Sequence, residues 1–373
     1  MIYFDNAATS GFKPYLSIQA ATFAINYLNA NSGRSGHKLA ATSEKFVYET
    51  RKQLCSFFNG DDLSRVIFTK NCTEALNLAI FGYVKKGDHV ITTYADHNSL
   101  LRPLYHLKNS GFASLSVAYP KGEELSPSDV LELVTDETTL VALSPVSNVT
   151  GKIFDYKKLA LALKGTRVKL LIDGAQACGR IPIDMSDGVD MLAVAGHKGL
   201  NSIQGVGALI FNKDIELSPL TYGGSGSETF LPVPTSYPEK LEAGTLNLPA
   251  ICSLYEGCVY TRKNLKNGAA TLTTLTQFLI DKLEKLDVKI YSVPNESGIV
   301  AFSSPKIDSI TLSQILSEKY DIATRGGFHC APLLHERLKT NVDGLLRVSL
   351  SPYNTKREIC KLEYALKEIF SLF

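Results

Sequence analysis

The chain has 373 residues, of which 45% are hydrophobic and 20% charged, so its composition excludes a disordered or fibrous protein. Its 39 Lys and Arg residues against 37 Asp and Glu leave a net charge of +2, too little to attract nucleic acid or an anionic membrane surface. No apolar run is long enough to span a membrane, and the first residues lack a basic-then-apolar secretion signal. We therefore expect neither a secreted nor a membrane protein, and no nucleic-acid partner.

Seven short runs rich in β-branched and other apolar residues predict strands within 64–69, 88–93, 113–119, 138–144, 168–173, 189–194 and 205–211. Segments of helical period separate them, for example at 73–83 and 156–163. Strands that alternate with helices indicate an α/β fold with a mostly parallel, seven-stranded sheet covered by helices. The runs are almost wholly apolar, as expected for strands that are buried on both faces.

The alternation stops near residue 215. Residues 217–249 are rich in Gly, Pro, Ser and Thr and predict an ordered loop or a hairpin insertion. A long helix is expected around 250–283, followed by a smaller α+β part with strands near 288–292 and 345–350. We predict a large domain of residues 15–250 and a small domain of residues 1–14 and 251–373.

The cysteine usage is typical of a reducing compartment. Seven cysteines are scattered along the chain without a C-x-x-C pair, and an odd number cannot all form disulfides. They are Cys55, Cys72, Cys178, Cys252, Cys258, Cys330 and Cys360. We expect a cytoplasmic protein in which most of these side chains are small buried hydrophobes.

Ligands of open α/β sheets bind beyond the carboxyl ends of the strands, and polar residues follow several of the predicted strands. Asp173 closes the most apolar strand, where a carboxylate is costly unless it is paired. It is either a structural capping residue or a fixed anion for a protonated ring nitrogen or a metal. No Asp, Glu or His cluster at ligand spacing accompanies it, so we expect no metal site.

Two further strand ends carry candidate residues. Lys198, in AGHKG, is either an ordinary surface lysine or a desolvated amine suited to Schiff-base chemistry. The segment from Asn71 to Glu74 lies between a strand and a helix, and is either a plain helix cap or a seat for a phosphate. A phosphate seat, a strand-end Asp and a strand-end Lys together fit pyridoxal 5'-phosphate.

An ordered series of motifs covers essentially the whole chain: YFDNAAT, NSGRSGHKLA, TEALN, ADHNS, SNVTG, DGAQ, GHK, EAGT, RGGFHCAP and RVSLSPYNT. The series resembles the class V aminotransferase group of fold-type I pyridoxal-phosphate enzymes, and within that group the cysteine desulfurases. The short R-x-G-x-H-C-A form at 325–331 is similar to their group II (SufS-like) branch.

The resemblance implies a set of residues that hold the cofactor. Lys198 would bind it covalently, Asp173 would pair with its pyridine nitrogen, Gln176 would bond its phenolic oxygen, and His97 would stack on the ring and take part in proton transfer. The phosphate would be held by Thr73, the backbone of Cys72, His197 and, from the second subunit of a homodimer, Thr245.

The resemblance also implies the reaction. Cys330 would be the nucleophile, with the positive charge of His329 and Arg325 favouring its thiolate. Asn148, Arg347, Arg325 and His37 would bind the substrate, with Arg347 on its carboxylate. L-cysteine would be converted to L-alanine, and the persulfide formed on Cys330 would pass to a sulfur-acceptor protein.

Alternatives remain open at this point. A selenocysteine lyase, a related C–S lyase or an aminotransferase would share most of these residues, whereas a non-catalytic scaffold would have no need of Lys198. The sequence departs from the family pattern at Ala195, at Ser202-Ile203 and at Cys72, where Thr or Ser is common. The sulfur acceptor, and with it a role in iron–sulfur cluster assembly, tRNA thiolation or another pathway, is not fixed by these motifs.

Overall fold

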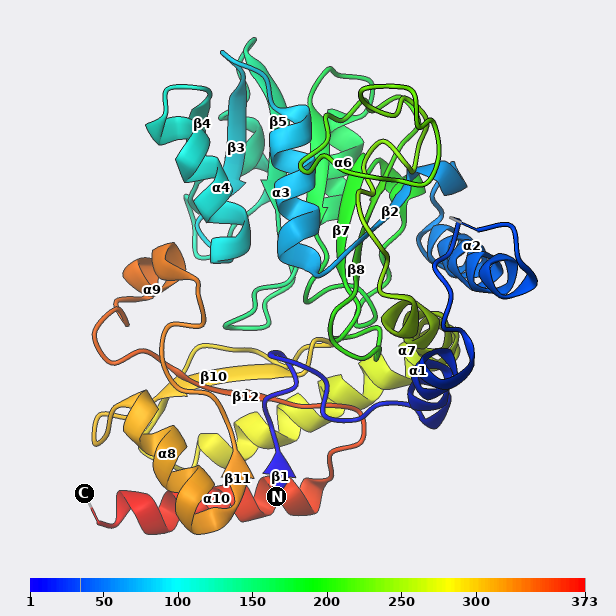
Figure 1. Ribbon diagram of the computed structural model, residues 1–373. Coiled ribbons are helices and arrows are strands. Elements are labelled where there is room, and N and C mark those ends of the chain that lie inside the picture. The colour runs from blue at the N-terminus through cyan, green and yellow to red at the C-terminus, as the bar shows by residue number, and fades with distance from the viewer. Residues whose placement is uncertain (34, 373) are drawn as a thin grey trace.

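The computed structural model describes residues 1–33 and 35–372. Its centre is a seven-stranded sheet in the order β2-β8-β7-β6-β5-β3-β4 (Figure 1). The strands are β2 (Val66–Thr69), β3 (His89–Thr93), β4 (Ser114–Ala118), β5 (Thr138–Leu143), β6 (Lys169–Asp173), β7 (Met191–Ala195) and β8 (Gly207–Phe211). Only β8 runs against its neighbours in this sheet. The predicted mostly parallel, seven-stranded sheet is therefore confirmed, with every strand in its expected segment except that β7 runs one residue further, to Ala195.

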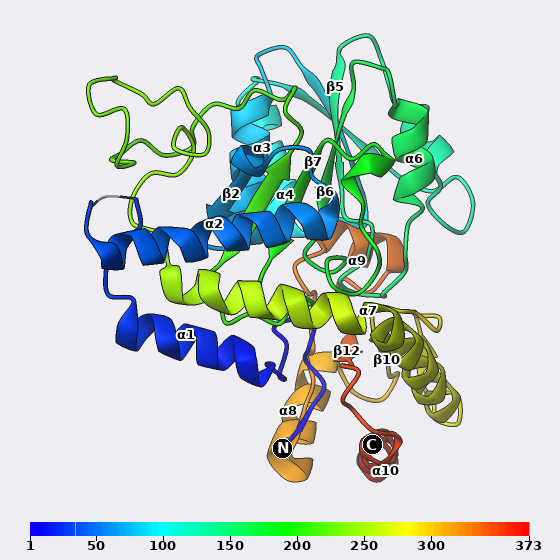
Figure 2. The same ribbon diagram turned by 90° about the vertical axis from the view of Figure 1, so that its right-hand side faces the viewer.

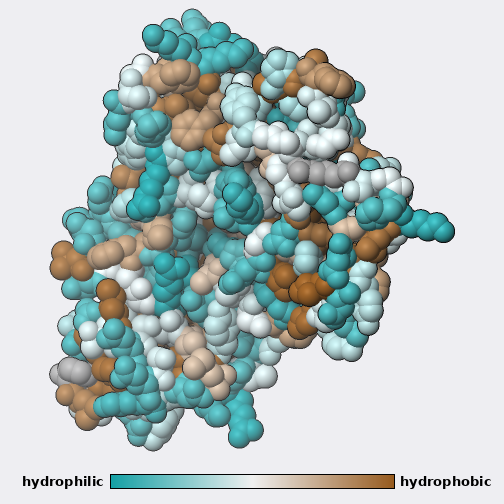
Figure 3. Space-filling model, in the orientation of Figure 1, coloured by the Kyte–Doolittle hydropathy of each residue, from teal (hydrophilic) through white to brown (hydrophobic). Residues whose placement is uncertain are grey.

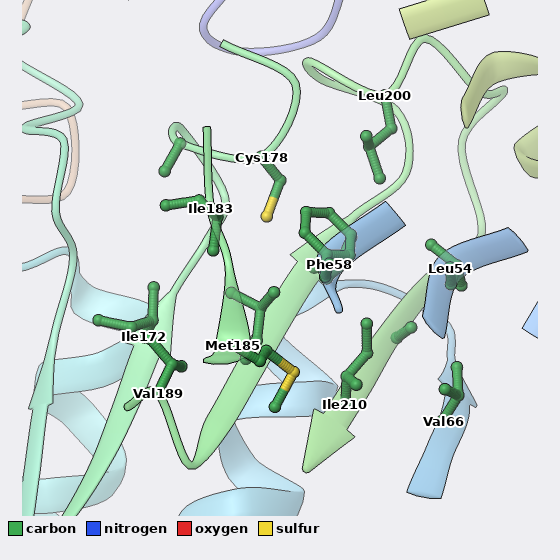
Figure 4. Close-up of a cluster of buried hydrophobic side chains, with 14 of the residues drawn as sticks. Leu54, Phe58, Val66, Ile172, Cys178, Ile183, Met185, Val189, Leu200 and Ile210 are labelled. Atoms are coloured by element: carbon green, nitrogen blue, oxygen red, sulfur yellow. The ribbon is translucent and has the colours of Figure 1, made fainter. Parts of the chain in front are cut away.

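Helices cover both faces of the sheet, which explains why the strands are so apolar. Along β6, Leu171 packs on the side of α3 (Cys72–Tyr83) and α4 (Asn98–Asn109). Its neighbours Leu170 and Ile172 point to the opposite face, into the cluster formed with α2 (Lys38–Phe58), α6 (Tyr156–Leu163) and part of α7. Figure 4 shows part of this second cluster around Ile172 and Ile210. Because successive strand side chains alternate between faces, both positions must be apolar.

The longest helix, α7 (Leu248–Leu283), links the two ends of the molecule. Its first part lies beside α2 and α1 (Tyr15–Tyr27), and Figure 2 shows the three helices stacked on one side of the sheet. The first part of α7 belongs to the core of the large sheet, and the stretch from Leu272 to Leu283 packs in a separate core. The helix crosses residue 250 without a break, so the domain boundary placed there stays a prediction.

The second core belongs to a smaller α+β part that holds both chain ends (Figure 1). Strand β10 (Ile299–Ser303) pairs antiparallel with β12 (Leu346–Ser349) and β9 (Lys289–Ile290), and β1 (Ile2–Tyr3) pairs with β11 (Ile322–Ala323). The helices are α8 (Ser309–Tyr320), α9 (Pro332–Leu338) and α10 (Lys356–Phe370). The strands expected near 288–292 and 345–350 form, whereas β10 had no counterpart in our expectations.

The segment between β8 and α7 contains no helix or strand, so the loop expected at 217–249 is present and a hairpin is not. Glu242 anchors it to the sheet by a buried ion pair with Arg51 and by accepting the amide of Phe68. The remaining short helices are α5 (Pro127–Leu131) and the 3-10 turns Leu63–Arg65 and Met185–Asp187.

Hydrophilic side chains cover much of the face seen in Figure 3, with hydrophobic ones in scattered patches. Within residues 1–33 and 35–372, no helix has the length and apolarity needed to cross a membrane.

Candidate active site

The carboxyl ends of the parallel strands meet at one edge of the sheet, where open α/β folds bind ligands. His97 follows β3, Asn148 follows β5, Asp173 ends β6, and Lys198 follows β7. The negative charge of Asp173 acts on the pKa of both His97 and Lys198, in each case against the effect of burial. The three ionisable groups therefore lie in one site. The structure thus brings together the strand-end residues that the sequence singled out.

Asp173 is buried, with only 2% of its surface exposed. Its Oδ1 accepts a hydrogen bond from the amide of Ala175 at 3.0 Å and a second from the thiol of Cys72, with Sγ at 3.4 Å. Cys72 is the first residue of α3, so this helix begins directly against the carboxylate. The contact with the amide of Ala175 is of the capping kind, and the contact with Cys72 joins the carboxylate to the start of α3.

The amine of Lys198 has no hydrogen-bond or ion-pair partner within the described chain. Burial lowers its pKa, and Asp173 opposes that effect. The turn is tight at the next residue, because a Cβ on Gly199 would lie 2.1 Å from the carbonyl oxygen of Cys178. A desolvated, unpartnered amine on a fixed turn is suited to nucleophilic and base chemistry.

His97 caps the start of α4, where its Nδ1 accepts from the amide of Ser99 at 3.0 Å. Burial lowers the pKa of the imidazole to about 4, although the carboxylate of Asp173 works against this. The ring is therefore neutral at neutral pH, and its orientation is set by the first turn of α4. A neutral, oriented imidazole can stack on an aromatic ring or relay a proton.

The start of α3 offers donors to an anion. The side chain of Asn71 caps the helix by accepting a hydrogen bond from the amide of Glu74 at 2.9 Å, so the segment does form a helix cap. The amides of Cys72 and Thr73 lie in the first turn, where no intrahelical acceptor exists, and the side chain of Thr73 is exposed. Both features of this helix start remain available to a phosphate.

Two nearby side chains bear on whether pyridoxal phosphate fits. The buried Nδ1 of His197 has no partner in the described residues, and burial together with Lys198 lowers the pKa of this imidazole to about 4. Gln176 is buried and donates to the carbonyl of Ala7 at 3.0 Å. An orphaned imidazole nitrogen, the free helix amides and the unpartnered Lys198 amine form a donor set that suits the phosphate, ring and aldehyde of that cofactor.

Cys330 is exposed on the loop between β11 and α9. His329 and Cys330 have φ values of 48° and 59°, a left-handed conformation that costs free energy in non-glycine residues. Two hydrogen bonds of 2.7 Å hold the loop: the amide of Asn98 donates to the carbonyl of Cys330, and Nδ2 of Asn148 donates to that of His329. The backbone of Cys330 is thus tied to the residue that follows His97.

The expectation that His329 lends positive charge to Cys330 is wrong. His329 is 2% exposed, its Nε2 bonds the carbonyl of Leu345 at 2.9 Å, and its Nδ1 has no partner among the described residues. Burial and the nearby Arg347 lower its pKa to about 2, so the ring is neutral. Arg325 is then the remaining charge of the two that the sequence suggested.

Arg347 is 1% exposed and lies on β12. One end of its guanidinium pairs with Asp5 at 2.9 Å, the other donates to the carbonyl of Asn148 at 2.8 Å, and its Nε has no partner in the described part of the chain. Its backbone pairs with that of Arg325. Both arginines and Asn148 therefore lie beside the loop that carries Cys330.

Residues 2–362 match the family described as aminotransferase class-V. The chain belongs to this family. A protein of Methanothermobacter thermautotrophicus named "Probable cysteine desulfurase" is 30% identical to it, across 99% of this chain and 94% of that protein. A solved apo structure of the cysteine desulfurase of Thermococcus onnurineus NA1 has a TM-score of 0.91 and 28% identity, covering 100% of this chain and 95% of the other. The S-sulfonic acid form of the cysteine desulfurase CsdA of Escherichia coli has a TM-score of 0.88 at 26% identity, with 100% and 95% covered.

Enzymes of the class V aminotransferase family depend in general on pyridoxal phosphate, in keeping with the donor set above. Two predicted site residues of this family member make hydrogen bonds outside that set. Thr245 is exposed and accepts from Asn31 at 3.2 Å, and the exposed His37 caps α2 by accepting the amide of Ala40. Arg34, within the motif NSGRSGHKLA, lies outside the described residues. No group of three or more potential metal ligands occurs within residues 1–33 and 35–372.

Three site residues were missed from the sequence. Asp96 is fully buried and accepts from Thr93 and from the amide of Ser144 at 2.7 Å, which joins the ends of β3 and β5. Asp5 pairs with Arg347, and Lys13 donates to the carbonyl of His197 at 2.9 Å. The signal for Asp5 and Asp96 was their place inside motifs already noted. Lys13 had no such signal.

Proposed function

We propose that the chain is a pyridoxal-phosphate-dependent cysteine desulfurase that converts L-cysteine to L-alanine and carries the released sulfur as a persulfide on Cys330. The names of the relatives and of the solved structures support this activity. The observation that carries it is the 2.7 Å hydrogen bond from the amide of Asn98 to the carbonyl of Cys330. It joins the backbone of the loop that carries the exposed Cys330 to the residue after His97, where an aminotransferase needs no cysteine.

In this proposal the cofactor occupies the donor set at the strand ends. Lys198 binds it covalently, and Asp173 pairs with its ring nitrogen. Gln176 bonds its phenolic oxygen and His97 stacks on the ring. The phosphate is held by Thr73, by the amide of Cys72 and by His197, whose buried Nδ1 otherwise lacks a partner.

Bound pyridoxal phosphate supplies an electron sink that lets the amino acid give up its Cα proton and weakens its Cβ–S bond. The amine of Lys198 accepts the Cα proton at Nζ, which its lowered pKa favours because more of the amine is neutral. His97, neutral and oriented by Ser99, relays protons on the same side of the site. Burial of these groups keeps bulk water away from the exchanging protons.

Cys330 provides the acceptor for sulfur. Its thiolate attacks the sulfur of the substrate, the new S–S bond forms as the Cβ–S bond breaks, and the electron pair of that bond stays on carbon. Two protons restore the products, so that L-cysteine and the Cys330 thiol yield L-alanine and a Cys330 persulfide without any external oxidant or reductant.

Arg347 and Asn148 bind the substrate carboxylate in this proposal, with Arg325 beside them. Arg347 is already paired with Asp5, so the substrate must share or displace that carboxylate. The orphaned Nε of Arg347 is a donor that needs no displacement. A forked arginine with one free donor suits a carboxylate ligand.

The assembly and cellular setting complete the proposal. Thr245 and His37 lie away from the site of their own chain, which agrees with a homodimer in which they serve the partner's phosphate and substrate. The short cysteine loop favours the group II branch, and the free cysteines favour the cytoplasm. A sulfur-acceptor protein takes the persulfide, and selenocysteine is the second candidate substrate because selenium leaves carbon by the same route.

The test is incubation with L-cysteine followed by mass spectrometry of the Cys330 peptide and measurement of L-alanine. We expect this peptide to gain one sulfur, and Lys198→Ala to gain none. Cys330→Ala should lose sulfur transfer yet keep the cofactor colour. Cys360→Ala, which alters the other exposed cysteine, is the matched control and should match the unmodified protein.

Undiminished alanine formation by Cys330→Ala would instead favour a C–S lyase, and turnover of selenocysteine but not cysteine would favour a selenocysteine lyase. A purified protein without bound cofactor that takes up none on addition would overturn the proposal.

A further inference from the structure

The thiol of Cys72 is in direct contact with a carboxylate of the proposed active site. It is 7% exposed, and its Sγ is 3.4 Å from Oδ1 of Asp173, the carboxylate that faces the cofactor in the proposed function. Sulfur is a weak hydrogen-bond donor, but its contacts are longer than those of oxygen, and this one is within its range. The side chain therefore has a contact that the phosphate-binding role of the Cys72 backbone does not require.

The thiol must be the donor in this contact. Burial and the negative charge of Asp173 both raise the pKa of Cys72 well above its ordinary value, so the S–H proton stays in place at neutral pH. A carboxylate accepts and does not donate, which fixes the direction of the bond. The Asp173 carboxylate thus receives one donor from α3 and one from the amide of Ala175.

Both donors converge on the same oxygen. No hydrogen bond from the described residues ends on Oδ2 of Asp173, whereas Oδ1 has the two just named. Two donors on one oxygen restrain the rotation of the carboxylate. Oδ2 is left for a further partner.

We propose that Cys72 is a positioning residue whose thiol, by donating to Oδ1 of Asp173, holds that carboxylate oriented with Oδ2 available to the protonated ring nitrogen of the cofactor. The inference rests on the proposed function, because it assigns the ring nitrogen to Asp173. The inference also gives a role to the cysteine that stands at position 72, where Thr or Ser is common in the family. A serine hydroxyl would make the same contact, and an alanine would not.

Cys178 provides a matched comparison within the same chain. Its thiol is also buried next to Asp173, and the two groups interact electrostatically. It makes no hydrogen bond to the carboxylate in the described structure, and Figure 4 shows its side chain within the apolar core near Phe58 and Ile183. Removing Cys178 therefore removes a buried thiol of equal size without removing a donor.

The experiment measures two properties of the cofactor-loaded protein: the dissociation constant of pyridoxal phosphate and the pH midpoint of its visible absorbance. The variants are Cys72→Ala, Cys72→Ser and Cys178→Ala. The other ionisable groups facing Asp173 are Lys198, His97 and Cys178, and neither Cys72 variant changes them.

We expect Cys72→Ala to displace the midpoint by about 0.5 pH unit and to weaken cofactor binding about threefold to tenfold, as the loss of one weak bond to a charged group implies. Cys72→Ser should restore both values to near those of the unmodified protein, and Cys178→Ala should leave the midpoint unchanged. Coincident midpoints for Cys72→Ala and the unmodified protein would overturn the inference, as would equal displacement by Cys72→Ala and Cys72→Ser. Failure of the unmodified protein to bind the cofactor would instead overturn the proposed function.

Discussion

The neutral state of His329 makes the stability of the protein depend on pH in a calculable way. Its ring is buried against Leu345 and Arg347, and its pKa falls from the ordinary value of 6.5 to about 2 in the folded chain. The perturbation is a change of pH from 7 to 5, compared between the unmodified protein and His329→Gln, whose side chain stays neutral throughout.

The magnitude follows from proton linkage. At pH 7 the histidine is mostly neutral in both the folded and the unfolded chain. At pH 5 the unfolded chain binds the proton and the folded chain does not, since its pKa is about 2. The contribution of His329 to the free energy of unfolding is therefore fully present above the pKa of the unfolded chain and is lost as the pH falls. The loss is about 1.4 kcal/mol for each pH unit below 6.5, or about 2 kcal/mol at pH 5. The lowered pKa of His97 acts in the same direction, and the raised pKa of Asp96, about 6, acts in the opposite one.

The assay is urea denaturation at pH 7 and pH 5 without added cofactor, followed by circular dichroism. His97 and Asp96 contribute equally in both proteins, so they cancel in the comparison. We expect the unmodified protein to lose about 2 kcal/mol more than His329→Gln on acidification. His106→Gln, which alters an exposed histidine, is the control. Equal losses in the unmodified protein and His329→Gln would refute the conclusion that His329 is held neutral.

Three further predictions concern the scaffold. Glu242→Gln leaves the buried Arg51 without its carboxylate and should lower the free energy of unfolding by about 3–5 kcal/mol in urea denaturation, whereas Glu132→Gln, at an exposed ion pair, should cause no measurable change. Gly199→Ala places a Cβ 2.1 Å from a backbone carbonyl and should abolish the colour of bound cofactor, measured by visible absorbance, because the turn that carries the adjacent lysine must shift. Lys339→Gly relieves a residue with φ of 57° at the end of α9 and should raise the midpoint of thermal unfolding by a few degrees at most, measured by calorimetry.

Much of the fold could be predicted because its signal is local. A strand buried on both faces must be apolar at every position, and β6 and β7 are apolar enough to be recognised by that rule alone. The long helix α7 begins at Leu248, after the capping residue Asn247 and with Pro249 in its first turn, a start that sequence also signals. Strand β10 was missed because its short apolar run is flanked by Gly298 and three serines, and pairing with β9 and β12 makes it a strand.

The sequence could place candidate site residues at strand ends, but it could not reveal which side chains burial would keep neutral or paired. Lys198, Asp173 and His97 follow strands, and topology alone brings them together. The charge of His329 depends on its packing against Leu345 and beside Arg347, which no neighbour in sequence reveals. The same applies to the pairing of Asp5 with Arg347, two residues at opposite ends of the chain.

Asn148 joins two parts of the site that the sequence treated as separate. Its side chain donates to the carbonyl of His329, and its own carbonyl accepts from Arg347, both within 2.8 Å. The loop it holds keeps His329 and Cys330 in left-handed conformations, which cost roughly 1–2 kcal/mol each and persist only under such restraint. A carboxylate that draws Arg347 away from Asn148 therefore also changes what restrains the loop. In the proposed function, substrate binding at Arg347 and presentation of the Cys330 thiol would thus be linked through one residue, Asn148, by its side-chain amide and its backbone carbonyl.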